Sequence, residues 1–180
     1  MTVQTLPQTG TWVLDPTHSQ IEITARHLMV SKVRGTFKEF TGAIIVGDSP
    51  GTSSVEATLV AASIDTGVED RDKHLRSPDF LDVENFPTIT FDSLNVSRDG
   101  NDHELTGDLT IKGVTKPITL DLEYLGVATD PWGNEKVAFE ASGTFDREDW
   151  GLNWNVALET GGWLVSKQFG ISIIAQAAKA

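Results

Sequence analysis

The sequence predicts an all-β domain, a barrel or sandwich of about eight mostly antiparallel strands with one short helical insertion near residues 67–82. Three observations lead to this prediction. Apolar residues recur at every second position along most of the 180 residues, which is typical of strands with one buried face. Clusters of turn-forming residues separate these runs. One charge-rich stretch, TGVEDRDKHLRSPDFLDVENFP at 66–87, carries helix signals instead. A closed barrel would leave no sheet edge unpaired.

Six runs are the clearest strand candidates because their apolar members keep one phase. These members are Ile21, Ile23 and Ala25; Val55, Ala57, Leu59 and Ala61; Leu105, Gly107, Leu109 and Ile111; Ile118, Leu120, Leu122 and Tyr124; Val137, Phe139, Ala141, Gly143 and Phe145; and Phe169, Ile171, Ile173 and Ala175. Turns are expected at residues 47–51, 98–101, 112–113 and 130–134.

Small residues share the inward phase with large ones, among them Gly107, Ala141 and Gly143. A barrel of about eight strands is just wide enough to be filled by side chains or to hold one small ligand. Small inward residues favour a cavity, but inward glycines also mark β-bulges and corner bends. The pattern alone leaves both interpretations open.

The helical insertion has recognisable ends. Thr66 and Glu69 have the spacing of a capping box, which predicts a helix from Gly67. Pro78 disfavours helix at the residue before it, so the helix is expected to end there. The same proline is expected to open a second short turn over residues 79–82.

The charges of this helix are explained largely by helix architecture. Two acid-before-base pairs at i,i+4 spacing, Glu69 with Lys73 and Asp72 with Arg76, each stabilise a helix by a few tenths of a kcal/mol. Val68 and Leu75 define its apolar stripe. Arg71 and Asp72 lie beside this stripe, so they are the polar groups aimed best at a barrel mouth, or they satisfy buried backbone ends. His74 lies on the flank.

Composition excludes several partners. The net charge of −12 disfavours a phosphate-backbone partner, so no nucleic acid is expected. The absence of cysteine excludes disulfides, a thiolate nucleophile and cysteine-ligated zinc. Without an apolar run of 18 or more residues, no transmembrane segment is expected. The N-terminal residues lack a signal-peptide pattern, which predicts a cytoplasmic protein.

No catalytic motif is assembled in the sequence. The four histidines show no metal-binding spacing, and Asp72 and His74 fall on different helix faces. His103 lies near a polar turn and is expected to be solvated. His27 continues the inward phase of Ile21 and Ile23, where it could contact a ligand or be an ordinary core histidine. An alternative hypothesis is therefore a small metal-dependent hydrolase that uses His27 with Asp72 or His74.

Four segments resemble the YceI-like family of polyisoprenoid- and lipid-binding proteins. They are LDPTHSQIEITARHLMVSKVRGTFKEFTG (14–42), RDKHLRSPDFLDVENFPTITF (71–91), LTGDLTIKGVTKPITL (105–120) and FDREDWGLNWN (145–155). The resemblance implies an extended lipocalin-like barrel, formed by residues 11–180 after a lead-in of residues 1–10, that encloses a long apolar tunnel. It also implies no catalytic cofactor and a possible homodimer.

The resemblance leads to the hypothesis of a non-enzymatic protein that binds, stores or transports a polyprenyl or isoprenoid-quinone-like chain, or another long-chain amphiphilic lipid. A further alternative is a stress-related structural or interaction protein with an incidental cavity. The resemblance carries over motif residues whose ligand contacts motif membership does not settle: His27, Phe37, Phe40, Arg71, Asp72, Leu75 and Phe80.

The alternation of apolar residues predicts which residues form the tunnel wall. The large apolar residues of inward phase are Ile23, Leu59, Phe91, Leu109, Leu120, Leu122, Phe139 and Ile173. Gly143 is expected to leave room for the ligand. Trp150 and Trp154 could form amphipathic rims at the mouth, or pack as part of an ordinary terminal turn.

Overall fold

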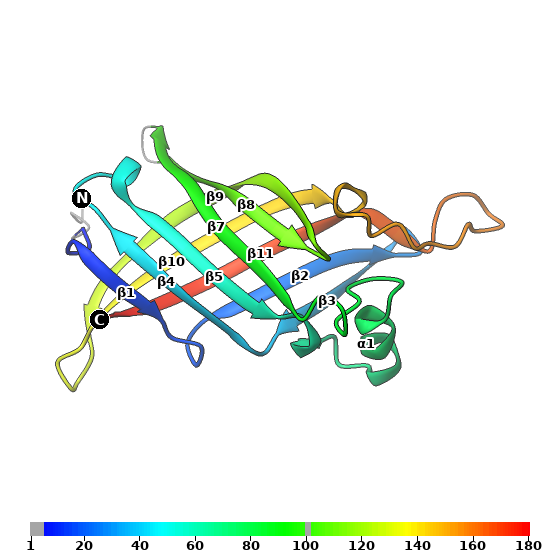
Figure 1. Ribbon diagram of the computed structural model, residues 1–180, viewed down its shortest axis with the longest axis horizontal. Coiled ribbons are helices and arrows are strands. Elements are labelled where there is room, and N and C mark those ends of the chain that lie inside the picture. Colours follow the sequence, from blue (N-terminus) through cyan, green and yellow to red (C-terminus); the bar gives the residue numbers. More distant parts are fainter. Residues whose placement is uncertain (1–5, 100–101) are drawn as a thin grey trace.

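The computed structural model describes residues 6–99 and 102–180, and it confirms an all-β barrel with one short helix (Figure 1). Eleven strands form one antiparallel sheet. Their bounds are β1 Gly10–Leu14, β2 Gln20–His27, β3 Ser31–Phe37, β4 Phe40–Val46, β5 Ser54–Val60, β6 Ile64–Asp65, β7 Thr88–Asp99, β8 Asp102–Ile111, β9 Val114–Thr129, β10 Glu135–Asp146 and β11 Val165–Lys179. Short 3-10 turns cover η1 Pro50–Thr52, η2 Ala61–Ser63 and η3 Arg147–Trp150.

These elements build a barrel of eight long strands, three of which are broken. The first long strand is β1 with β2, the second β3 with β4, and the third β5 with β6. Each long strand pairs with the next along the chain. β11 closes the ring, because it pairs with β10 along one edge and with both β1 and β2 along the other. The prediction of about eight adjacent antiparallel strands is confirmed.

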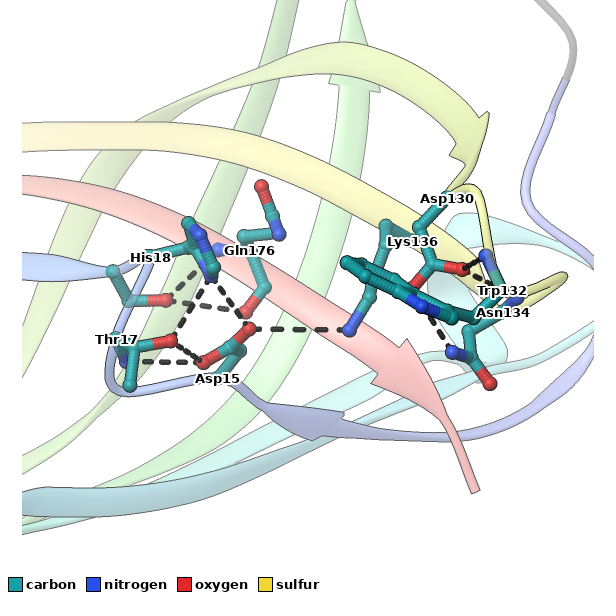
Figure 2. Close-up of polar contacts among 9 residues, drawn as sticks. Asp15, Thr17, His18, Asp130, Trp132, Asn134, Lys136 and Gln176 are labelled. Carbon is teal, nitrogen blue, oxygen red and sulfur yellow. Dashed lines mark hydrogen bonds and ion pairs between the residues drawn. The ribbon is translucent and has the colours of Figure 1, made fainter.

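The first break, at residues 15–19, is held to β11 by the backbone bond from Asp15 N–H to the carbonyl of Gln176 and by side-chain bonds of Ser19. Ser19 Oγ donates to the carbonyl oxygen of Gln176 and accepts from its N–H. The Asp15 carboxylate lies between the Thr17–His18 turn and Lys136 of β10 (Figure 2). Hydrogen bonds from Thr17 and His18 lower the pKa of Asp15 to about 2. The Asp15 carboxylate thus organises the turn within the break and joins it to β10.

The second and third breaks face each other. Lys38 N–H donates to the carbonyl of Ser63, and Glu39 N–H donates to its hydroxyl. The Ser63 hydroxyl also donates to the carbonyl of Val60. The insertion with the helix follows, so these bonds hold the barrel end on which the helix rests.

Some large side chains inside the barrel lie opposite small ones on the adjacent strand. Along β10 and β11, Ala141 pairs with Ile173 and Gly143 with Ile171. Two glycines leave space for neighbouring aromatic rings. A Cβ on Gly107 would lie 2.4 Å from the ring of Phe91, and one on Gly143 would lie 2.7 Å from the ring of Phe145. These glycines therefore make room for rings.

Two single-residue β-bulges interrupt the sheet, and the first lies opposite Gly107, which pairs with Ser93. One interrupts β7 between Ser93 and Asn95, and the other lies between Ala138 and Phe139 of β10 and its partner β9. The residues left over by these shifts, Leu94 and Leu125, are exposed. The bulges thus turn two leucines out of the barrel.

Helix α1, Glu69–Arg76, lies at the end of the barrel opposite the start of β1 and the end of β11 (Figure 1). It ends before Ser77, as predicted. The predicted capping box is wrong: Val68 is the N-cap residue, and no side chain caps the helix. Gly67 has a φ of 81°, a left-handed conformation that a helix start cannot use. Residues 79–82 form a hydrogen-bonded turn and not a helix.

The predicted turns lie between strands. Lys112 and Gly113 both have positive φ, as a two-residue hairpin between β8 and β9 requires. Asp130 accepts hydrogen bonds from the side-chain amide and the backbone of Asn134 and from the backbone of Trp132 (Figure 2), and these bonds lower its pKa. Part of the expected turn at 98–101 lies outside the described residues. In the described part of the chain, no helix is long and apolar enough to cross a membrane.

We predict that Asp15→Asn lowers the free energy of unfolding by about 1–2 kcal/mol at pH 7, because the charged acceptor of two side-chain bonds is lost. The folded-state pKa of about 2 lies below the ordinary 3.8. The contribution is therefore complete above pH 3.8 and disappears as the pH falls through about 2. Urea unfolding of both proteins from pH 7 to pH 2 measures this convergence. Asp121→Asn, at an exposed position on β9, is the control.

Candidate functional site

The interior of the barrel holds an apolar cavity of about 550 Å³. Its wall includes side chains from β2, β5, β7, β8, β9, β10 and β11. The predicted residues that lie on this wall are Ile23, Phe37, Leu59, Leu75, Phe80, Phe91, Leu109, Leu120, Leu122, Phe139 and Ile173. Small inward residues, including Ala25, Ala57 and Ala141, line it as well. The volume lies in the range of small-molecule pockets.

The insertion between β6 and β7 forms the wall at one end of the cavity. Leu75 of α1 and both Phe80 and Leu81 of the following turn line it. Phe80 also packs against His74 and Trp154, with ring centroids 5.0 and 5.4 Å away. His74 accepts or donates one hydrogen bond with Asp79, 2.8 Å away. This aromatic cluster of His74, Phe80 and Trp154 covers the helical end.

Arg71 and Asp72 fasten the insertion and are absent from the cavity wall. Asp72 is buried, and its carboxylate accepts from both the N–H and the hydroxyl of Thr66, at 2.9 and 2.6 Å. Arg71 donates to the hydroxyl and the carbonyl oxygen of the same threonine. The structure thus follows the alternative in which this pair satisfies backbone ends.

One of the two predicted ion pairs of α1 is formed and the other is not. Glu69 and Lys73 are 3.4 Å apart, as expected. The predicted pair of Asp72 with Arg76 is not formed. Asp72 is occupied by Thr66, and Arg76 instead donates to two carbonyl oxygens of residues 62 and 64. Longer-range backbone partners outcompete the local pair.

Five further predicted residues lie away from the cavity wall. His27 is exposed at the end of β2, beyond the enclosed part of the barrel, although it keeps the inward phase. Phe40 is buried in the packed core of the barrel. Trp150 is also buried, and its indole N–H donates to the carbonyl of Leu109, so it is not a rim. The space at Gly143 is taken by Phe145. Trp154, in turn, reaches the cavity only through Phe80.

The structure does not assemble the alternative site of His27, Asp72 and His74. Asp72 is bonded to Thr66 and His74 to Asp79, whereas His27 lies on a different element. Across residues 6–99 and 102–180, no three histidine, aspartate, glutamate or cysteine side chains are arranged to hold a metal ion. The hydrolase hypothesis therefore has no supporting geometry.

Two polar residues of the cavity wall were not predicted there. His103 was expected in a solvated turn, and Arg147 was missed. His103 is on β8, half-buried and on the cavity wall, and not in a solvated turn. Arg147, in η3, also lines the cavity and is 5% exposed. The inward row of β10 runs through odd positions to Phe145, and the next odd position is Arg147. Extending that row by two residues would have found it.

Arg147 is held by two backbone carbonyls. Its Nε donates to Ser166 at 2.9 Å, and its Nη1 donates to Leu152. The remaining nitrogen, Nη2, is buried without a hydrogen-bond partner. Burial lowers the pKa of Arg147, and the nearby charges of Glu148 and Asp146 oppose this shift. An unpaired buried donor costs about 1–3 kcal/mol, and a charged one costs more.

The fold and the site together define a class: closed eight-stranded antiparallel barrels that enclose an apolar cavity, here with a single buried arginine on the wall among the described residues. Comparison with known proteins identifies the family. The YceI-like domain matches residues 12–177, and the chain belongs to this family.

Relatives support this assignment. A UPF0312 protein of Staphylococcus epidermidis is 45% identical over 156 residues, which are 85% of this chain and 88% of that protein. The crystal structure of a Campylobacter jejuni YceI protein has a TM-score of 0.74 and 30% identity, and the match covers 86% of this chain and 90% of that one. A polyisoprenoid binding domain from Saccharophagus degradans, implicated in plant cell wall breakdown, has a TM-score of 0.69 and 14% identity. That match covers 96% and 100% of the two chains, and it shows the shared fold.

We predict that Gly143→Ala lowers the free energy of unfolding by about 1–3 kcal/mol, because the new methyl group would collide with the ring of Phe145. Thermal or urea unfolding measures the loss. Gly51→Ala is the matched control, since no atom lies within 4 Å of a Cβ there. Equal stability of Gly143→Ala and wild type would show that Phe145 turns away freely.

Proposed function

We propose that the protein binds a long-chain isoprenoid, or a similar single-chain amphiphilic lipid, inside the barrel and acts as a non-enzymatic carrier or store. The observation that carries this proposal is the cavity of about 550 Å³ with an almost wholly apolar wall. Burial of apolar ligand surface is favourable by about 25 cal/mol per Å². A long hydrocarbon chain can therefore bind with few polar contacts when the cavity is preformed.

The likeness to a polyisoprenoid-binding domain supports this choice of ligand class. An isoprenoid chain is apolar and branched at regular intervals, and the wall presents branched aliphatic and aromatic side chains along the whole barrel.

Extraction of the purified native protein followed by mass spectrometry tests the proposal directly. We expect a co-purified lipid, or uptake of an added polyprenyl compound by the delipidated protein. Absence of both would overturn the lipid-binding function and leave the structural or interaction hypothesis.

A cavity-filling variant tests the location. Ala57 lines the cavity from β5, whereas its neighbour Thr58 lies exposed on the outer face. We predict that Ala57→Phe reduces lipid uptake about tenfold or more, because the ring occupies ligand volume, and that Thr58→Phe leaves uptake within about twofold. Titration of a fluorescent polyprenyl analogue measures both, with circular dichroism to confirm folding. Unchanged uptake in Ala57→Phe would place the ligand outside the barrel.

A further inference from the structure

The guanidinium group of Arg147 is built as an incomplete binding site. Its bonds to the carbonyl oxygens of Ser166 and Leu152 hold the planar group in one orientation. The third nitrogen, Nη2, has no partner, although the side chain is 95% buried and lies on the cavity wall. A guanidinium needs acceptors for all of its N–H groups, since it can neither rotate its donors independently nor lose its charge.

The charge of Arg147 is also left without an acid at contact distance. Among the residues that the structure describes, none of the ion pairs includes this guanidinium. The carboxylates next to it in sequence have other partners: Asp146 accepts from the N–H of Glu148, and Glu148 pairs with Lys167 at 3.3 Å. A buried cation without an acid in contact would be stabilised by an anion from outside the chain.

The position of Arg147 sets the orientation of such a ligand. Phe80 lies over the guanidinium, with the ring centroid 5.9 Å from Cζ, and Leu152 lies beside it on the same wall. This is the end of the cavity that the insertion covers. Away from it the wall is formed mainly by apolar side chains of the barrel strands. A head group at Arg147 therefore leaves the whole apolar length for the tail.

We propose that Arg147 is the head-group site of the barrel and binds an anionic oxygen, a phosphate or carboxylate, at the end of a single-chain lipid. This inference rests on the proposed lipid-binding function. The oxygen accepts from Nη2, and its charge replaces the missing counter-ion. Nη2 is covered in the closed barrel, so the Phe80 ring turns aside when the head group binds. The tail then runs along the strands toward the opposite end.

The test compares two ligands that differ only at the head, geranylgeranyl phosphate and geranylgeraniol, with the delipidated full-length chain. For the wild type we expect the phosphate to bind about 10- to 100-fold more tightly than the alcohol. In Arg147→Gln this preference should fall to about twofold or less, with the affinity for the alcohol unchanged. Arg147→Lys keeps the charge but not the planar fork, so it should retain part of the preference.

The outcomes distinguish the role of Arg147 from the lipid-binding function. Equal binding of the two ligands by the wild type would overturn the role of Arg147 and leave the lipid-binding function standing. Failure of both ligands to bind would overturn the lipid-binding function itself. Inorganic phosphate at millimolar concentration should not displace the bound lipid, and displacement by phosphate alone would indicate a site for free anions.

A measurement on the wild type keeps the test independent of variant folding. The side-chain NMR signal of the Arg147 guanidinium should shift when the phosphate ligand is added and should stay in place with the alcohol. A shift of equal size with both ligands would contradict a contact to the head group.

Discussion

The cavity depends on one packing constraint: several of the aromatic rings that point into the barrel lie against a small residue of the same or the adjoining strand. Phe91 rests against Gly107 and Phe145 against Gly143, while Ala141 of β10 lies opposite Ile173 and Ala175 of β11 lies opposite Phe139. Protein interiors tolerate neither overlap nor empty space at well-packed positions. Because these pairs fill the interior evenly near the wall, the remaining volume is collected in one continuous space.

The architecture could be predicted from the sequence because alternation of apolar residues is a local signal. The inward rows of β8, β9, β10 and β11 all carry the expected residues, and the hairpin at Lys112 and Gly113 has the required backbone conformation. Adjacent antiparallel strands also follow from short turns. The breaks within the long strands are less visible, since each depends on a bond to a distant segment, such as Ser19 to Gln176.

Polar residues of the site were predicted less well, because their partners lie in other segments of the sequence or outside the local helix or strand periodicity. Helix periodicity paired Asp72 with Arg76, but the carboxylate binds Thr66 in the preceding loop. His27 keeps the right phase on a strand that extends past the enclosed interior. The inward row of β10 reaches Arg147 only when it is extended two residues past Phe145. Only the three-dimensional structure shows that two of its nitrogens are satisfied and one is not.

Closure of the barrel by β1 and β11 also bears on how the protein folds. Trp12 pairs with Lys179, and the N–H of Ala180 donates to Thr11, so the last seam joins segments from far ends of the sequence. Contacts of such long sequence separation slow folding, because the entropy of loop closure is lost before they form. The earlier hairpins can assemble in order, yet their apolar face stays open to solvent until β11 docks. The interior that would receive a lipid is therefore enclosed only once this long-range seam has formed, and a lipid present at that moment would be enclosed without having to pass the aromatic cluster at the helical end.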